Sequence, residues 1–235
     1  MLNLTSIKKI LILILLLAVP GFLYYLLMAK GQNRYKPLPI YGPKQVAKTF
    51  HKVKGKVIYD TIYHQIPNFK LYDQENKLIS EDSLKGKIAV FNFFFTRCPT
   101  LCKEINKNIA ELAVSYNKNP ILKFVSITVD PATDNTAVLK SYATSLKADP
   151  KQWKFLTGDT STIYPLSRNG FLVTAINGNN NPENFVYSEK LILIDQERRI
   201  RGYYNGTSIN EVSQLNDEIK VLIAEELRKI KSNLY

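Results

Sequence analysis

The feature that most constrains the fold is an apolar run that leads directly into the only two cysteines of the chain. Residues 88–95 read IAVFNFFF, a nearly continuous apolar segment that is typical of a strand buried on both faces of a sheet. Cys98 and Cys102 follow, with Pro99 next to the first thiol, and residues 101–116 then carry apolar side chains at helical spacing. We therefore expect a buried strand, a short loop that holds a dithiol, and a helix.

The spacing of the two cysteines suits two kinds of chemistry. On a helix, side chains four residues apart have Cβ atoms roughly 5–6 Å apart, whereas a disulfide prefers about 3.5–4.5 Å. Two thiolates on opposite sides of one soft metal ion, each bound at about 2.3 Å, lie about 4.6 Å apart. The pair formed by Cys98 and Cys102 therefore suits a soft metal ion at least as well as a disulfide.

The rest of the pattern predicts an α/β domain with a central mixed sheet. We expect strands near residues 57–59, 69–72, 88–95, 122–129, 153–156, 172–176, 191–195 and 200–204, and helices over 101–116, 134–146, after Asp159, and over 208–227. A reactive pair placed where the first buried strand runs into a helix is the thioredoxin arrangement. The helix N-terminus there favours the thiolate form of Cys98. The prediction is a three-layer, thioredoxin-like fold.

A second apolar segment precedes this domain. Residues 10–29 contain no charge, and about 20 helical residues at 1.5 Å each cross a bilayer core of ~30 Å. We predict a short N-terminal segment at 1–9, a single transmembrane anchor at 10–29, a linker at 30–55 and the folded domain at 56–235. A cleaved signal peptide is the alternative, but the run is long for one and no small-x-small cleavage site follows it. Basic residues flank both ends, so charge alone leaves the orientation open.

The charge of the chain assigns no function by itself. The formal net charge is +12, from 32 Lys and Arg against 20 Asp and Glu. The basic residues are spread along the whole chain and no nucleic-acid-binding motif accompanies them, so we do not expect a nucleic-acid partner. We interpret the charge as a solvated basic surface, which favours anionic lipid headgroups or an acidic partner.

Three groups of motifs resemble the Sco/SenC family, the membrane-anchored, thioredoxin-like, copper-binding proteins that help to build the copper site of cytochrome c oxidase. The resemblance covers about residues 60–230 and rests on FTRCPTLC at 95–102, SITVDP at 126–131 with Asp134, and LILID at 191–195 leading to GYYNG at 202–206. It implies that Cys98 and Cys102 are copper ligands. It also implies a single-pass protein of the cytoplasmic (inner) membrane, whose domain lies on the extracytoplasmic side. The implied partner is the oxidase copper-site subunit or another copper or thiol protein.

The chain departs from the family at the third copper ligand. The resemblance places a histidine just before the strand of the late hairpin, and in the matching stretch FVYSEKL at 185–191 this position holds Tyr187. A phenol has a pKa near 10 and offers a hard oxygen, so it is a poor substitute. We expect the two histidines, His51 and His64, to be ordinary surface or capping residues, which leaves the third ligand unidentified. Two thiolates can still hold Cu(I), so we expect Cu(I) rather than Cu(II).

Polar residues near the dithiol have two interpretations each. After a buried strand a carboxylate often caps the next helix, which we expect of Asp134, with Asn135 as the other candidate for that cap. Asp130 is a candidate for the sheet edge near the thiols, where it would tune their charge. Arg97 either stabilises the thiolate of Cys98 or is simply solvated.

These residues support two main functions. The first is a metallochaperone that binds Cu(I) through the dithiol and passes it to an oxidase subunit by ligand exchange, without catalytic turnover. The alternative is a thiol–disulfide oxidoreductase, in which one thiolate attacks a partner disulfide and the other resolves the mixed disulfide, a reaction that needs no imidazole. A binding module whose thiols are merely buried or bridged is a third possibility. A peroxidase is least expected, because a third cysteine and the T-x-x-C motif are both missing.

Overall fold

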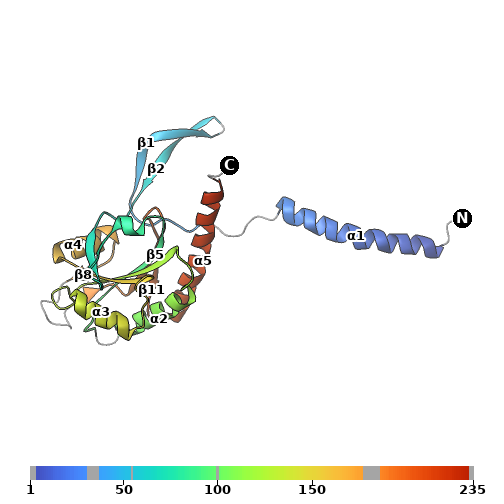
Figure 1. Ribbon diagram of the computed structural model, residues 1–235. Coiled ribbons are helices and arrows are strands. Elements are labelled where there is room, and N and C mark those ends of the chain that lie inside the picture. Colours follow the sequence, from blue (N-terminus) through green and yellow to red (C-terminus); the bar gives the residue numbers. More distant parts are fainter. Residues whose placement is uncertain (1–3, 31–36, 54, 99–100, 177–185, 233–235) are drawn as a thin grey trace. The chain divides into compact units, whose positions relative to one another are not determined.

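The computed structural model describes residues 4–30, 37–53, 55–98, 101–176 and 186–232. The chain divides into two compact units, Met1–Lys36 and Pro37–Tyr235. The first unit contains the helix α1 (Leu4–Lys30), and all other elements belong to the second unit (Figure 1). Residues 37–55, which were predicted as part of a linker, fall in the second unit.

Helix α1 covers the segment that was predicted as a membrane anchor. The side chains described between Ile12 and Tyr25 are exposed, and Pro20 lies inside the helix. Over the residues that the structure describes, no helix is both long enough and apolar enough to cross a membrane. The transmembrane helix predicted at residues 10–29 is therefore not confirmed.

A seven-stranded mixed sheet forms the centre of the second unit. Its strands, in spatial order, are β11 (Ile200–Asn205), β10 (Lys190–Ile194), β5 (Ile88–Phe94), β6 (Leu122–Thr128), β7 (Trp153–Thr157), β3 (Lys70–Asp73) and β4 (Leu78–Ser80). The three central strands β5, β6 and β7 run parallel, and the outer strands pair antiparallel. Every residue of β5 is buried, as its apolar run predicted. The prediction of a central mixed sheet is confirmed.

Helices cover both faces of this sheet (Figure 1). They are η1 (Glu81–Leu84), α2 (Leu101–Ser115), α3 (Thr136–Ser145), α4 (Thr160–Pro165), η2 (Leu166–Gly170) and α5 (Ile209–Ser232). Alternate side chains of β5 point to opposite layers. Phe91 and Phe93 pack on Phe171, which follows η2, with ring centroids 4.6 and 5.4 Å apart. Phe94 stacks instead on Tyr142 of α3, so the three predicted layers are present.

The last helix begins at Ile209, one residue after the predicted start, and Ser208 caps it. The Ser208 hydroxyl accepts the Glu211 N–H at 3.4 Å. The Glu211 carboxylate turns instead to the N–H of Asn205 at 2.6 Å and so ties α5 to the end of β11. Helix α5 also lies against α2, because the Tyr116 hydroxyl donates to Asn216 Oδ1 at 2.7 Å.

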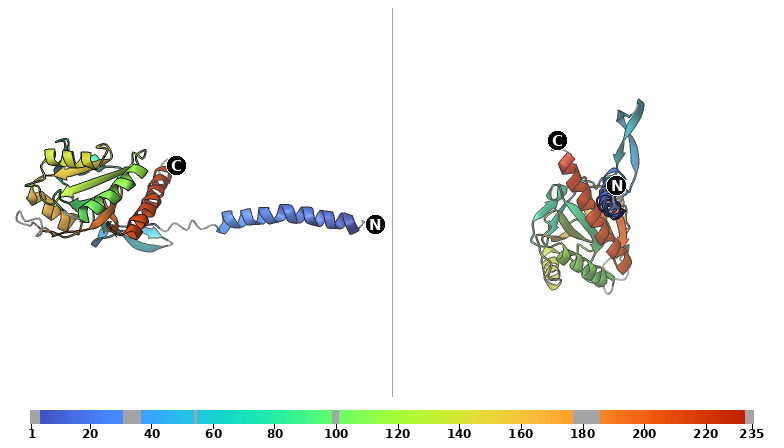
Figure 2. Two further views of the ribbon diagram at one scale, coloured as in Figure 1. Left: turned by 90° about the horizontal axis from the view of Figure 1, so that it is seen from below. Right: turned by 90° about the vertical axis from the view of Figure 1, so that its right-hand side faces the viewer.

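A separate hairpin begins within the segment that was predicted as a linker. Strands β1 (Lys44–Val53) and β2 (Lys56–Tyr63) pair antiparallel in a two-stranded sheet of their own. The hairpin reaches away from the central sheet in Figure 1 and in the right-hand view of Figure 2. Its base is held by two hydrogen bonds, from the Tyr41 N–H to the Ile200 carbonyl at 2.9 Å and between His64 Nε2 and the Gly170 carbonyl at 2.7 Å.

A short second ladder lies before the late hairpin. Strands β8 (Ala175–Ile176) and β9 (Val186–Tyr187) pair antiparallel, with Ala175 opposite Tyr187. The strand predicted at 172–176 is therefore confirmed only in its last two residues. Residues 177–185 lie outside the described part of the chain.

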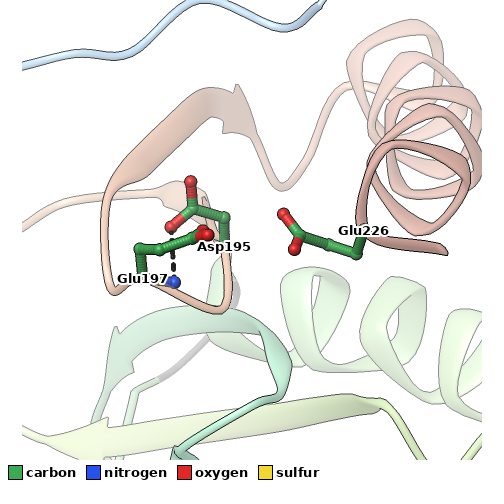
Figure 3. A group of neighbouring side chains, drawn as sticks. All are labelled: Asp195, Glu197 and Glu226. Carbon is green, nitrogen blue, oxygen red and sulfur yellow. Dashed lines mark hydrogen bonds between the residues drawn. The ribbon is translucent and has the colours of Figure 1, made fainter. Parts of the chain in front are cut away.

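Ion pairs join the turn between β10 and β11 to helix α5. Asp195, Glu197 and Glu226 bring carboxylate oxygens within 4.8 Å of one another, close enough in principle to hold a cation (Figure 3). Cations of the chain already neutralise them. Arg199 lies 2.7 Å from Asp195 and 3.0 Å from Glu197, and Lys229 lies 2.7 Å from Glu226. We therefore interpret this group as a structural ion-pair network.

Candidate functional site

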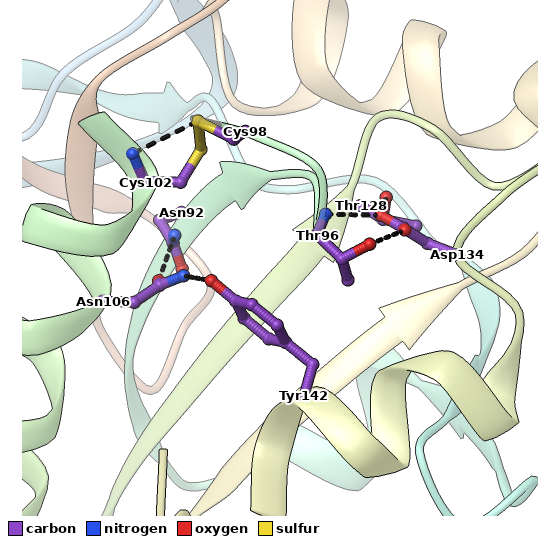
Figure 4. The surroundings of a disulfide bond; sticks show 8 residues. All are labelled: Asn92, Thr96, Cys98, Cys102, Asn106, Thr128, Asp134 and Tyr142. Carbon is purple, nitrogen blue, oxygen red and sulfur yellow. Dashed lines mark hydrogen bonds between the residues drawn. A yellow bond between two sulfur atoms is a disulfide. The ribbon is translucent and has the colours of Figure 1, made fainter. Parts of the chain in front are cut away.

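The two cysteines lie together at the carboxyl end of β5. Cys98 ends the described part of the loop that follows β5, and Cys102 lies in the first turn of α2. Both side chains are buried, and a disulfide joins them across a Cα separation of 5.8 Å (Figure 4). The Cys102 N–H points to Cys98 Sγ at 3.2 Å. Of the two kinds of chemistry that the spacing allowed, the structure holds the disulfide; Pro99 and Thr100 lie outside the described residues.

A buried carboxylate holds the loop that carries Cys98. Asp134 accepts the Thr96 N–H at 3.0 Å and, through its other oxygen, the Thr96 hydroxyl (Figure 4). The Thr128 hydroxyl at the end of β6 donates to the same carboxylate at 2.5 Å. Burial raises the pKa of Asp134 above its ordinary value, and the three hydrogen bonds oppose this shift.

The prediction that Asp134 caps helix α3 is wrong. The capping residue is Asn135, the other candidate, whose side chain accepts the Val138 N–H at 3.0 Å. Asp134 points the other way, toward Thr96, because the turn after β6 bends its backbone back. The Asp134 N–H donates to the Asp130 carbonyl at 2.9 Å in this turn.

A second carboxylate neutralises the arginine beside Cys98. Arg97 Nη2 lies 2.7 Å from Asp130 Oδ2. The Asp130 side chain is buried, whereas that of Arg97 is 38% exposed. Asp130 lies two residues after the end of β6, at the carboxyl edge of the sheet, where the sequence placed it. The positive charge of Arg97 near the thiols is therefore paired with the buried carboxylate of Asp130.

A chain of buried polar side chains lies on the α2 and α3 side of the sheet (Figure 4). The Trp153 indole donates to Ser126 Oγ at 2.8 Å, and the Ser126 hydroxyl donates to Asn92 Oδ1 at 2.6 Å. Asn92 then contacts Asn106 at 3.4 Å, and Asn106 donates to the Tyr142 hydroxyl at 2.9 Å. Asn106 lies one helical turn after Cys102, so this network anchors the helix that carries the second thiol.

Sequence reasoning missed both the network and the role of Asp134. The available signals were an asparagine in the otherwise apolar run 88–95 and another at a core-facing position of the helix 101–116. Trp153 lies in the core, and its indole N–H has a buried partner, as large polar-tipped side chains require.

With this geometry established, similarity to known proteins decides the family. The SCO1/SenC family model matches residues 61–224, which is most of the second unit. The chain belongs to the SCO1/SenC family. The family resemblance recognised in the sequence motifs is thereby confirmed.

Several SCO1/SenC relatives match much of the chain. An SCO2-like protein of Rickettsia prowazekii is 30% identical over 218 residues, which cover 90% of this chain and 96% of the relative. The crystal structure of a SCO1/SenC family lipoprotein from Bacillus anthracis has a TM-score of 0.63 and 27% identity, covering 68% of this chain and 95% of that one. The structure of ScoI from Bradyrhizobium japonicum with copper bound has a TM-score of 0.55 and 25% identity, covering 66% of this chain and 98% of that one. These structures confirm the thioredoxin-like fold.

The SCO1/SenC histidine position stays a prediction for this chain. The backbone of Tyr187 belongs to β9, but its side chain lies outside the described residues. His51 and His64 are engaged in other contacts. His51 Nδ1 lies 2.8 Å from Asp60 on the separate hairpin, and His64 holds the base of that hairpin. A third copper ligand is thus not identified among the described side chains.

Proposed function

We propose that this protein is a copper-binding assembly factor of cytochrome c oxidase that carries Cu(I) on the thiolates of Cys98 and Cys102. One observation carries the proposal: the only two cysteines of an SCO1/SenC chain lie close enough to share a bond, in a loop fixed by a buried carboxylate. The copper bound to the Bradyrhizobium japonicum relative supports copper as the cargo.

The donor atoms available fit Cu(I) better than Cu(II). Reduction of the disulfide with two electrons and loss of the thiol protons yields two thiolates, which are soft ligands. The Cys102 N–H that contacts Cys98 Sγ would stabilise charge on that sulfur. Cu(II) favours nitrogen and tetragonal geometry, and no histidine is described beside the pair. The dithiol should therefore retain Cu(I) and hold Cu(II) weakly.

Competition with a Cu(I) chelator tests this proposal. The full chain, reduced and kept without oxygen, should retain one Cu(I) per molecule. Cys98→Ser and Cys102→Ser should each lose retention, and the double variant is a cysteine-free blank because the chain has no other thiol. Complete loss of copper from the reduced wild-type chain to the chelator would overturn the proposal.

The observed disulfide favours a second candidate, a thiol–disulfide reductant. The Cys98 thiolate would attack a partner disulfide and release one partner thiolate, and the Cys102 thiolate would then displace the partner from the mixed disulfide. The products are the bridged pair and a partner dithiol, so the two electrons pass to the partner. Cys98 is the expected nucleophile because its sulfur receives the Cys102 N–H.

Single-cysteine variants separate this reductant from a copper carrier. Cys102→Ser should trap a covalent mixed disulfide with a disulfide-containing partner, whereas Cys98→Ser should trap none. If trapping occurs while the wild-type chain never retains Cu(I), the reductant function replaces copper carriage.

The tyrosine at the expected histidine position offers a separate test of the ligand assignment. We propose that Tyr187→His restores the third ligand and gives tight Cu(II) binding, which the wild-type chain lacks. Visible absorption and electron paramagnetic resonance of the Cu(II)-loaded chain measure it. An unchanged, weak Cu(II) signal would contradict the assignment of position 187.

We also propose that the protein is attached to the cytoplasmic (inner) membrane through α1, with the second unit on the extracytoplasmic side. Large apolar side chains along α1, such as Ile12, Leu16 and Phe22, are exposed, and the Bacillus anthracis relative is a lipoprotein. The chain should sediment with membranes and be digested by protease added outside intact spheroplasts. Recovery in the soluble fraction would contradict this location.

A further inference from the structure

The hairpin of β1 and β2 is an exposed arm that the copper chemistry does not use. It forms a sheet of its own, and an isolated two-stranded hairpin is marginally stable in water. Its base is nevertheless fixed on the domain, where the Tyr41 ring packs edge-on against Tyr203 at 5.5 Å and Gly42 lies against His64. A hairpin that is fixed at its base and exposed along its strands is well placed to contact another surface.

The arm is strongly basic. Residues 44–63 contain five lysines and one acidic residue, a net charge of +4, which is a third of the +12 of the whole chain. The single acid, Asp60, is already paired with His51 at 2.8 Å. The arm therefore presents positive charge with no free carboxylate to offset it.

One face of the arm combines lysines with aromatic rings. The register pairs Lys44 with Tyr63, Phe50 with Tyr59 and Lys52 with Val57, so these six side chains share a face. The Phe50 and Tyr59 rings meet edge-on at 5.9 Å, and Lys44 Nζ lies 5.6 Å from the centroid of the Tyr63 ring. Phe50 is 54% exposed and Tyr59 is 58% exposed, although both are large apolar groups. We call these six residues the aromatic–lysine face.

We propose that the aromatic–lysine face docks on the surface of a bilayer that contains anionic lipids. Aromatic rings favour the headgroup level, and lysines lay their apolar stems along such a surface while their ammonium groups meet lipid phosphates. The face carries no acid and projects from the domain, as an element that lies on a surface must. Only thirteen residues separate the end of α1 from the start of β1, a reach of at most about 45 Å. The proposal rests on the membrane attachment proposed above in one respect: that attachment keeps the arm close to the bilayer.

A fluorescent reporter on the arm tests the docking in the full chain. Tyr59→Trp places an indole on the aromatic–lysine face, and the natural Trp153 is buried and out of reach of lipid. Brominated lipids quench an indole that enters the headgroup region. We expect quenching in vesicles of phosphatidylcholine with phosphatidylglycerol, none in pure phosphatidylcholine, and release at high salt. Flotation with the vesicles reports attachment of the whole chain separately, so failure of α1 to attach is distinguishable from failure of the arm to dock.

Charge variants make the test specific to the arm. In the reporter chain, Lys44→Gln with Lys52→Gln should weaken docking about 25-fold, because each lysine near an anionic surface contributes about five-fold. The matched control, Lys118→Gln with Lys140→Gln, removes the same charge from exposed positions outside the arm and should change docking less than two-fold.

Four results would overturn the proposal. The first two are an unquenched indole on anionic vesicles that carry the chain, and equal quenching on neutral vesicles. The third is an equal loss of docking in the arm variant and in the control variant. The fourth is binding of the arm to soluble polyglutamate but not to vesicles. The last result would assign the arm to an acidic protein partner instead.

Discussion

At the residue scale, Asp134 shows how one buried carboxylate organises the loop that carries Cys98. Its oxygens accept the Thr96 N–H, the Thr96 hydroxyl and the Thr128 hydroxyl, so the loop after β5 is tied to the end of β6. Burial raises the pKa of this carboxyl above its ordinary value of 3.8. The native state therefore binds a proton at Asp134 more readily than the unfolded chain does.

This raised pKa predicts a pH dependence of stability. Protonated Asp134 stabilises the fold fully below pH 3.8, and this contribution is lost as the pH rises through the native pKa. Asp134→Asn should abolish the dependence, because an amide keeps an acceptor for the Thr96 N–H and offers a donor to a hydroxyl. Its free energy of unfolding at neutral pH should change by no more than about 1 kcal/mol. Urea unfolding from pH 3 to pH 7 measures both.

Asp134→Ala is the contrasting variant. It leaves the Thr96 N–H and the hydroxyls of Thr96 and Thr128 without their acceptor, which should lower the free energy of unfolding by about 2–4 kcal/mol. Equal pH profiles for the wild-type and Asp134→Asn chains would show that another group controls the dependence.

The asparagine pair beneath the dithiol supports a second prediction. Asn106→Leu keeps the size of the side chain but leaves the Nδ2 group of Asn92 and the Tyr142 hydroxyl without their Asn106 partner in the interior. The free energy of unfolding should fall by about 2–3 kcal/mol, measured by urea denaturation. Asn117→Ala, an exposed asparagine just beyond α2, is the control and should change it by less than about 0.5 kcal/mol. A similar small change in Asn106→Leu would show that the network does not anchor α2.

At the element scale, the sequence predicted the strands and helices that pack into the core and missed a strand that does not. The strand β5 and the helices α2 and α5 were predicted close to their observed bounds, because one or both of their faces pack into the core and leave a periodic apolar pattern. Strand β1 was missed, because both faces of its hairpin are exposed and its lysines resemble those of a linker. Asp134 was misassigned for a related reason. Whether a carboxylate caps its own helix or reaches a distant loop depends on contacts 38 residues apart in the chain.

Arg201 joins three elements, and its loss should be costly. The guanidinium is 2% exposed and contacts Asp195 at 3.1 Å, Glu225 at 2.9 Å and the Leu38 carbonyl at 2.7 Å. Arg201→Ala would leave the partly buried Glu225 without its cation and Asp195 with Arg199 alone, so the free energy of unfolding should fall by about 3 kcal/mol in thermal or urea denaturation.

Arg228→Ala serves as the control for that variant. It removes the same charge from an exposed position on α5 and should cost less than about 1 kcal/mol. Equal losses in the two variants would mean that overall charge, rather than the buried contacts of Arg201, sets the stability.

At the scale of the whole molecule, the fold brings the chemistry to the carboxyl edge of its parallel strands. The dithiol follows β5, and the carboxylates of Asp130 and Asp134 follow β6, its parallel neighbour. Ligand and reactive sites of α/β sheets lie at this edge, which is why the sequence located the cysteines before their contacts were known. The chain belongs to the SCO1/SenC family, and the placement of Tyr187 at the histidine position and the binding of Cu(I) by the dithiol stay proposals that a measurement on the loaded chain can decide.

X-ray absorption of the reduced, Cu(I)-loaded full chain tests this central claim most directly. Copper bound by Cys98 and Cys102 alone should show a shell of two sulfur atoms and none of the outer-shell scattering that imidazole produces. The cysteine-free double serine variant should show no sulfur shell. A copper site with imidazole scattering, or one without sulfur, would contradict the account in which the dithiol alone carries Cu(I).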